Sequence, residues 1–219
     1  LFAFSFENWE QSIITEVYGL HGFFVGLFML LVVLLKRSKT ESEKRKYFYS
    51  ISFVTGLALT NHTTALLFIP VFAVFMLIHD AKLILNLKVL GKSLLFGLAG
   101  LLPLLYLPIS SSFDPVMDWG NPETWTNFIR VISRHQYTDL AQTSEKFASG
   151  LSFYFTELLA GQWSPFLLVL LIPAFIGLFR LNKSMFYFSL LFLVFYIPVT
   201  TYLTDFDIRG EGYSANLNR

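Results

Sequence analysis

The sequence predicts an all-α fold, a polytopic transmembrane bundle of about six helices, and three observations lead to this prediction. Of the 219 residues, 54% are hydrophobic and only 14% are charged, whereas soluble domains usually hold about 25% charged residues. Apolar runs recur at lengths close to the roughly 20 residues that a helix needs to cross a bilayer. Lys and Arg gather between alternate runs, as is typical of polytopic membrane proteins.

The apolar runs define the expected helices. One run, Tyr47 to Ile78, is too long for a single span and is interrupted by Asn61-His62-Thr63-Thr64. We therefore expect two helices joined by a tight polar turn, with Asn61 capping the second helix. The other expected spans are Val17 to Leu35, Leu94 to Ile109, Pro165 to Phe179 and Met185 to Leu203.

These helices form one membrane domain with three segments. Residues 1–109 hold the N-terminal transmembrane helices, 110–164 form an extracytoplasmic loop, and 165–219 hold the C-terminal helices and an outer tail. The chain reads as an internal piece of a longer protein, because Leu1 is not an initiator methionine.

The distribution of basic residues orients the bundle. The densest basic stretch, Lys36 to Lys46, should face the cytoplasm, because Lys and Arg are enriched in cytoplasmic loops. Alternate threading then places residues 1–16, the turn at Asn61, the loop 110–164 and the C-terminal tail on the outer side. We therefore expect an integral membrane protein whose active face is extracytoplasmic.

The long outer loop contains two amphipathic stretches. The stretch from Pro122 to Tyr137 carries apolar side chains at helical spacing, and Phe147 to Leu159 is the second. Helices of this kind lie in the membrane interface, with their aromatic side chains at the level of the headgroups.

Ionisable residues near the hydrocarbon boundary are the first candidates for chemistry, because charge is costly there and often functional. Glu16, Tyr18 and His21 lie at the outer end of the first expected span. Glu16 is equally explained as a first-turn acid favoured by the helix dipole, and His21 as a hydrogen-bonding partner of a neighbouring helix. His62, beside Asn61, falls in the same leaflet as Glu16, so the two could line one cavity.

A second candidate is the loop segment Asp118-Trp119-Gly120-Asn121-Pro122. Gly120 allows a tight turn, and Asn121 followed by Pro122 is typical of a helix cap and first turn. Asp118 and Trp119 have no such structural explanation, and an acid beside an aromatic ring could bind a sugar.

Basic residues of the outer loop are candidates for binding a phosphate. Arg130 and Arg134 could hold a lipid-linked phosphate, because guanidinium pairs bidentately with phosphate. A face that contacts solvent or headgroups explains them as well. The sequence contains no cysteine and no P-loop, dinucleotide glycine fingerprint or zinc-ligand spacing, so we expect no metal and identify no cofactor. The net charge of +1 does not favour a nucleic-acid partner.

Three motifs in order carry a family resemblance. They are Thr15-Glu16-Val17-Tyr18-Gly19-Leu20-His21, Gly56-Leu57-Ala58-Leu59-Thr60-Asn61-His62, and Tyr106-Leu107-Pro108 followed by the segment from Asp118 to Pro122. They resemble a bacterial membrane-protein family of formerly unknown function, which has relatives in animals and is similar to protein O-mannosyltransferases of the GT-C glycosyltransferase class.

The resemblance implies a GT-C-like enzyme that takes a sugar from a polyprenyl-phosphate carrier and passes it to a protein or glycan acceptor outside the cytoplasm. Such enzymes keep their catalytic acid in the first extracytoplasmic loop, so the catalytic residues are expected upstream and this fragment alone is expected to be inactive. The residues carried over as substrate-binding rather than catalytic are Glu16, Tyr18, His21, Asn61, His62, Asp118, Trp119 and Asn121.

Two other classes of function stay open. A transporter or flippase fragment would place polar residues on broken helices at mid-membrane, and the break at Asn61 is the feature that fits. A non-catalytic membrane scaffold would instead pack the region from Glu16 to His62 shut.

Overall fold

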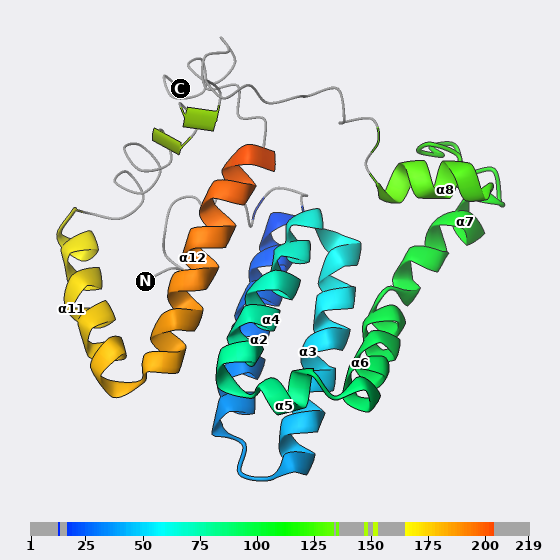
Figure 1. The fold of residues 1–219 in the computed structure, drawn as a ribbon. Coiled ribbons are helices and arrows are strands. Elements are labelled where there is room, and N and C mark those ends of the chain that lie inside the picture. Colours follow the sequence, from blue (N-terminus) through cyan, green and yellow to red (C-terminus); the bar gives the residue numbers. More distant parts are fainter. Residues whose placement is uncertain are drawn as a thin grey trace. The chain divides into compact units, whose positions relative to one another are not determined.

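In the computed structural model of the protein, the described residues are Ile13, 17–133, His135, 147–148, 151–152 and 165–203, without the side chains of 165–168 and 200–203. Regular secondary structure in these residues is helical throughout, which confirms the all-α class (Figure 1). The chain divides into two compact units. The α3–α6 unit comprises Leu20–Leu66 and Lys82–Ala141, and the α4–α12 unit comprises Leu1–Gly19, Leu67–Ala81 and Gln142–Arg219. The predicted division into three segments stays a prediction.

Helix α2, Tyr18–Arg37, forms where the first span was expected. Its buried side chains include Phe24, Phe28 and Val32, spaced at one helical turn, while Phe23 and Leu30 are exposed. Lys36 and Arg37 occupy its last turn, where positive charge interacts favourably with the helix dipole.

Helix α3, Glu41–Asn61, begins well before the expected Tyr47 because a capping box starts it inside the basic segment. The Thr40 hydroxyl accepts a hydrogen bond from the backbone N–H of Glu43 at 3.2 Å. In return, Glu43 Oε2 accepts from the N–H groups of Lys39 at 2.9 Å and Thr40 at 3.3 Å. Reciprocal bonds of this kind satisfy backbone donors that a helix start otherwise leaves unpaired.

The capping box makes helix stability depend on pH. Hydrogen bonds from the backbone N–H groups of Lys39 and then Thr40 hold the pKa of Glu43 below its ordinary value. A carboxyl group with a lowered folded-state pKa stabilises the fold above its unfolded pKa and loses that contribution as the pH falls through the folded value. We expect the melting temperature of the wild type to exceed that of Glu43→Gln at pH 7, and the difference to shrink between about pH 5 and pH 3. Thermal melts across that range test this, and a constant difference would contradict it.

The fourth expected span is a bent pair of helices. Helix α6, Leu87–Gly100, starts at the cap residue Asn86, whose Oδ1 accepts from the N–H groups of Lys88 and Val89. It continues through the 3₁₀ helix η3, Leu102–Leu105, into α7, Tyr106–Ser111. The helices on the two sides of the break are inclined by 41°. Pro103 lies in the first turn of η3 and cannot donate a backbone hydrogen bond, which accounts for a break at this point.

The close packing of α3 against α6 depends on glycine. A Cβ atom on Gly56 would collide with the carbonyl oxygen of Gly97, and one on Gly100 would collide with the carbonyl oxygen of Phe53. Nearer the start of the two helices, the rings of Tyr49 and Phe96 stack with centroids 5.3 Å apart and planes inclined by 2°. Residue numbers rise together along both helices, so α3 and α6 run parallel.

The α4–α12 unit packs through aromatic side chains. Helix α4, Phe68–His79, lies against α12, Lys183–Leu203. Phe75 and Phe188, both buried, meet edge to face at 5.0 Å, and aromatic pairs in this arrangement are favourable. Helix α11, Pro165–Leu181, packs on α12, and the short α5, Ala81–Ile84, follows α4.

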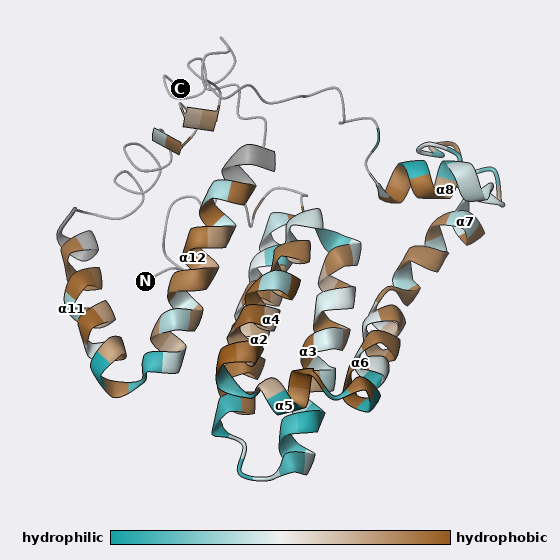
Figure 2. Cartoon of the chain, viewed as in Figure 1, coloured by the Kyte–Doolittle hydropathy of each residue, from teal (hydrophilic) through white to brown (hydrophobic). Residues whose placement is uncertain are grey.

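Among the described residues, α2 is the one helix long and apolar enough to cross a membrane. The bent pair from Leu87 to Ser111 passes as a second span if it is counted as one unit. Charged residues occupy the first two turns of α3. The described apolar helices at 63–79, 169–181 and 183–199 are 10–17 residues long, which is shorter than the roughly 20 residues that a span needs. Figure 2 colours the residues by hydropathy, and hydrophobic residues, in brown, recur along these helices. The structure does not confirm a bundle of six spans.

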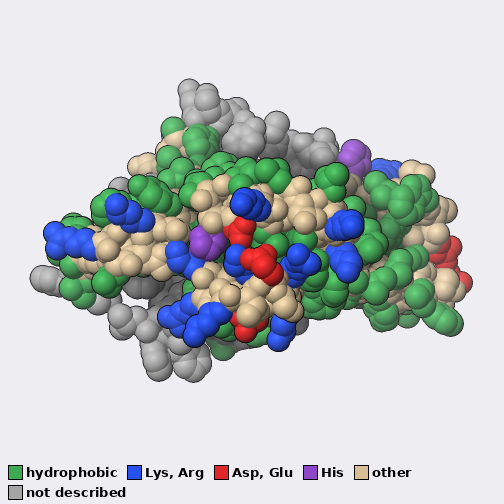
Figure 3. Space-filling view, turned by 60° about the horizontal axis from the view of Figure 1, so that its bottom comes forward, with side chains coloured by type: hydrophobic (Ala, Val, Ile, Leu, Met, Phe, Trp, Pro, Cys, Tyr) green, Lys and Arg blue, Asp and Glu red, His purple; other side chains and the backbone are tan. Residues whose placement is uncertain are grey.

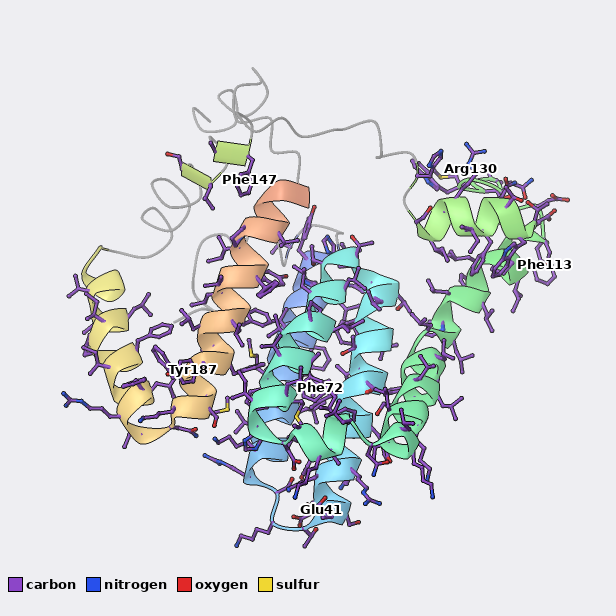
Figure 4. All side chains as sticks on the ribbon, viewed as in Figure 1. Glu41, Phe72, Phe113, Arg130, Phe147 and Tyr187 are labelled. Carbon is purple, nitrogen blue, oxygen red and sulfur yellow. The ribbon has the colours of Figure 1, made fainter. Side chains whose placement is uncertain are left out.

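The α3–α6 unit has two chemically different ends. Helix α2 runs toward the basic segment and α3 runs back from it, so His21 and His62 lie at one end and Lys36 to Lys46 at the other. Figure 4 labels Glu41 and Phe113, which lie at opposite ends of this unit. We call these the basic end, where α3 and α6 begin, and the polar end, where α3 stops and α7 follows α6.

Candidate functional site

The polar break that the sequence predicted is present at the polar end. Helix α3 stops at Asn61, and His62 takes an extended backbone conformation while its N–H donates to the carbonyl of Ala58 at 2.9 Å. The predicted capping role of Asn61 is wrong. The next element is the 3₁₀ helix η2, Thr63–Leu67, and α4 follows with Leu67 before it and no side-chain cap. The tight 3₁₀ turn supplies bonds such as Ala65 N–H to the His62 carbonyl at 3.1 Å, so no Asn cap is needed.

A hydroxyl group joins the two candidate histidines. Thr64 Oγ1 lies 3.0 Å from Nε2 of His21 and 2.7 Å from Nδ1 of His62. The two imidazole rings are 4.9 Å apart and tilted by 41°. His21 is 8% exposed and Thr64 4% exposed, while His62 is partly buried. We call these three residues the His–Thr–His cluster.

The cluster has one consistent arrangement of protons. The backbone N–H of Thr64 donates to Nδ1 of His62 at 3.3 Å, so this nitrogen is an acceptor and His62 carries its proton on Nε2. The Thr64 hydroxyl then also donates to Nδ1, and its oxygen accepts from Nε2–H of His21. A single hydroxyl group thereby contacts both imidazole rings and fixes their orientation.

A second cluster holds the loop after α7. The hydroxyl of Ser111, which is 1% exposed, donates to Oδ2 of Asp118 at 2.7 Å, and Oδ1 of Asn121 lies 3.4 Å from the same hydroxyl. Nδ2 of Asn127 donates to the backbone carbonyl of Asn121 at 2.8 Å. Ser111 is therefore a structural partner of Asp118 that the sequence did not reveal, and the hydrogen bond between them fixes the loop to the end of α7.

The backbone of this loop confirms part of the sequence reasoning. Gly120 has a φ of 74°, as expected for a tight turn, but Asn121 has a φ of 40° and does not cap a helix. Helix α8, Trp125–Ile132, starts at Thr124, whose hydroxyl accepts from the N–H of Asn127 at 3.2 Å. The expected start at Pro122 is therefore wrong, because a threonine three residues before Asn127 offers a better cap.

The other predicted site residues are placed as follows. Tyr18 is the first residue of α2 and is 49% exposed, Trp119 is 70% exposed, and Arg130 is exposed on α8 (Figure 4). Glu16 and Arg134 lie outside the described residues, as does most of the expected amphipathic stretch from Phe147 to Leu159. The convergence of Glu16, His62 and Asp118 on one cavity stays a prediction.

Sequence reasoning missed the two side chains that organise these clusters, Thr64 and Ser111. Each lies among similar neighbours, Thr63 and Thr64 or Ser110 to Ser112, and the sequence alone does not tell which hydroxyl is buried. In the part of the chain that the structure describes, no group of three or more His, Asp or Glu residues could hold a metal ion.

Similarity to known proteins extends over most of the chain. Residues 1–85 match the family described as the N-terminal domain of protein O-mannosyl-transferase TMEM260. These residues include the His–Thr–His cluster. The mouse protein O-mannosyl-transferase TMEM260 is 33% identical over 156 residues, which are 69% of this chain and 22% of the mouse protein. The Dictyostelium discoideum protein O-mannosyl-transferase tmem260 is 30% identical over 151 residues, 64% of this chain and 18% of that protein.

The chain is similar to protein O-mannosyl-transferases. It spans about a fifth of the length of the TMEM260 relatives it matches. The predicted similarity to O-mannosyltransferases is therefore confirmed, while the predicted bacterial origin stays a prediction. No solved structure matches the chain.

Proposed function

We propose that this chain is a portion of a GT-C-like membrane glycosyltransferase that moves a sugar from a polyprenyl-phosphate carrier to an extracytoplasmic protein or glycan acceptor. Protein O-mannosylation is one form of this reaction. The observation that carries the proposal is the 33% identity to a protein O-mannosyl-transferase over 69% of the chain. The catalytic residues belong to the part of the enzyme upstream of this chain.

The polar end supplies groups suited to a sugar. Its His–Thr–His cluster presents oriented imidazoles, and Trp119 offers an exposed ring beside the fixed carboxylate of Asp118. Arg130 on α8 is an exposed cation able to pair with the phosphate of the carrier. In this proposal Glu16, Tyr18 and Asn61 complete the lining, and Arg134 assists Arg130.

The proposal includes an integral membrane location with about six spans, in a bacterial inner membrane. Exposed leucines on α6, including Leu94, Leu95 and Leu98, support lipid contact, because they present apolar surface outside the protein core. The separation of the polar end from the basic end supports an extracytoplasmic working face, since Lys and Arg favour the cytoplasmic side.

The polar break does not by itself distinguish the alternatives. A transporter would place the break at mid-membrane, and the break at Asn61 follows a helix whose first two turns are charged. A scaffold agrees with the burial of His21 and Thr64. Loss of sugar transfer in variants that keep their fold distinguishes an enzyme from a scaffold.

Full-length protein assayed with polyprenyl-phosphate sugars tests the proposal. We expect Thr64→Val to lower transfer about ten-fold or more, because Thr64 positions both histidines and a misplacement of about 1 Å can cost up to about a hundred-fold in rate. Thr60→Val is the matched control, since the Thr60 hydroxyl only returns to the carbonyl of Leu57 at 2.7 Å. Asp118→Asn should lower transfer as well, whereas Asp114→Asn, at an exposed acid of the same loop, should not.

We expect Glu16→Ala to lower sugar transfer as well. Transfer that stays at the wild-type level in Thr64→Val, Asp118→Asn and Glu16→Ala would refute the assignment of the site. Absence of any transfer by the wild-type protein would refute the proposed function.

A further inference from the structure

A groove lies at the basic end of the α3–α6 unit, away from the candidate sugar site. It has a volume of about 600 Å³. Its lining side chains come from the beginning of α3 and from α6, and they are Glu41, Ser42, Arg45, Lys46, Tyr49, Ser50, Lys92 and Phe96. Neither the sugar-transfer proposal nor the resemblance to O-mannosyl-transferases makes use of this groove.

The charge of the groove suits an anion. Three cations, Arg45, Lys46 and Lys92, line it against one acid, Glu41. Oε1 of Glu41 is engaged by Nζ of Lys44 at 2.8 Å, so its negative charge is compensated from the α3 side. Figure 3 looks at the face of the molecule that carries the basic end, where Lys and Arg side chains crowd around a few acidic ones.

The groove is also amphipathic. The stacked rings of Tyr49 and Phe96 form an apolar wall between the two helices. Phe96 is 45% exposed, and its neighbour Leu95 on α6 is 66% exposed, so exposed apolar surface continues around α6 beside the groove. A ligand with a negative head and an apolar tail matches both surfaces, while a small soluble anion uses only the first.

The helices that frame the groove are held at a fixed distance. The glycine contacts of Gly56 with Gly97 and of Gly100 with Phe53 join α3 to α6 further along their length. The groove is therefore formed before a ligand arrives, which reduces the entropy lost on binding.

We propose that this groove binds the headgroup of an anionic phospholipid of the cytoplasmic leaflet. The lipid phosphate pairs with Arg45 and Lys92, Ser42 and Ser50 offer hydroxyls to the polar part of the headgroup, and an acyl chain lies along Tyr49 and Phe96. The inference rests on the proposed membrane location but is independent of sugar transfer. Clusters of basic residues at the cytoplasmic end of membrane helices are suited to acidic headgroups.

Lipid-dependent melting of the full-length protein in a neutral detergent tests this proposal. We expect short-chain phosphatidylglycerol to raise the melting temperature and short-chain phosphatidylcholine to leave it unchanged, since ligands that bind only the folded state stabilise it. In Arg45→Gln/Lys92→Gln, half-maximal stabilisation should require about a hundred-fold more phosphatidylglycerol, because two charge-assisted hydrogen bonds are lost and each loss weakens binding about ten-fold.

Lys82→Gln/Lys88→Gln is the matched control. It removes the same charge from α5 and α6 at exposed lysines that do not line the groove, and it should respond to phosphatidylglycerol like the wild type. Each double variant is first melted without lipid to verify that it folds. Phe96→Ala, which removes the apolar wall and no charge, should weaken the response as well.

Three results would overturn the proposal. The first is an equal response to phosphatidylcholine, and the second is an undiminished response in Arg45→Gln/Lys92→Gln. The third is an equal response to glycerol 3-phosphate, which would assign the groove to a soluble anion. The readout contains no sugar donor, so failure of the lipid site and failure of the glycosyltransferase proposal are distinguishable.

Discussion

Replacing Gly56 with alanine should destabilise the α3–α6 unit by about 3 kcal/mol, because overfilled packing sites cost about 1–3 kcal/mol and this one meets backbone on the opposite side. The added Cβ would collide with the carbonyl of Gly97 and lie 3.2 Å from the Cα of Gly100. A flexible side chain could move aside, but a helix backbone moves only if α3 and α6 separate. That separation would also disturb the stacked rings of Tyr49 and Phe96.

The matched control is Gly91→Ala on α6. Nothing lies within 4 Å of a Cβ at Gly91. Alanine is favoured over glycine inside a helix by about 0.5–1 kcal/mol, so this variant should be slightly more stable than the wild type. Thermal unfolding followed by circular dichroism in detergent measures both. Similar melting temperatures for Gly56→Ala and Gly91→Ala would show that α3 and α6 are not closely packed at Gly56.

Much of the helical arrangement follows from the sequence, because apolar runs and polar interruptions have direct physical consequences. The run from Val17 to Leu35 became α2, and the interruption at Asn61 became the break between α3 and η2. Helix starts were less predictable. Helices α3 and α6 begin in polar segments, where Thr40 and Asn86 supply hydrogen bonds that a hydropathy pattern does not register.

The candidate site was predictable in its position but not in its contacts. His21 and His62 were expected in one leaflet, and they lie 4.9 Å apart ring to ring. Thr64, which joins them, depends on the η2 turn that follows His62, and that geometry has no signature in the residue types. Ser111 and Asp118 meet across a loop in which Asp114 has a positive φ angle, and Gly120 and Asn121, also with positive φ, follow Asp118.

The central claim of this account is that the polar end faces outward and the basic end faces the cytoplasm. It joins the charge distribution, the candidate sugar site and the lipid groove in one orientation. The two ends are separated along α2 and α3, so a chain that spans the membrane must expose them on opposite sides. An inverted chain would place the candidate sugar site and the lipid groove on the wrong faces.

The sequence given contains no cysteine, so single cysteines introduced into it are specific reporters. Thr126 on α8 and Ser42 at the beginning of α3 are both exposed hydroxyl residues, and they report on the polar and the basic end. Each is replaced in the full-length protein, in a background without other cysteines. Thermal melts establish that Thr126→Cys and Ser42→Cys fold like the parent.

Labelling of intact cells with a membrane-impermeant maleimide is the deciding measurement. We expect rapid labelling of Thr126→Cys without permeabilisation, and labelling of Ser42→Cys only after the membrane is opened. Labelling of Ser42→Cys in intact cells, or protection of Thr126→Cys until permeabilisation, would contradict the outward placement of the polar end and with it the proposed site of sugar transfer.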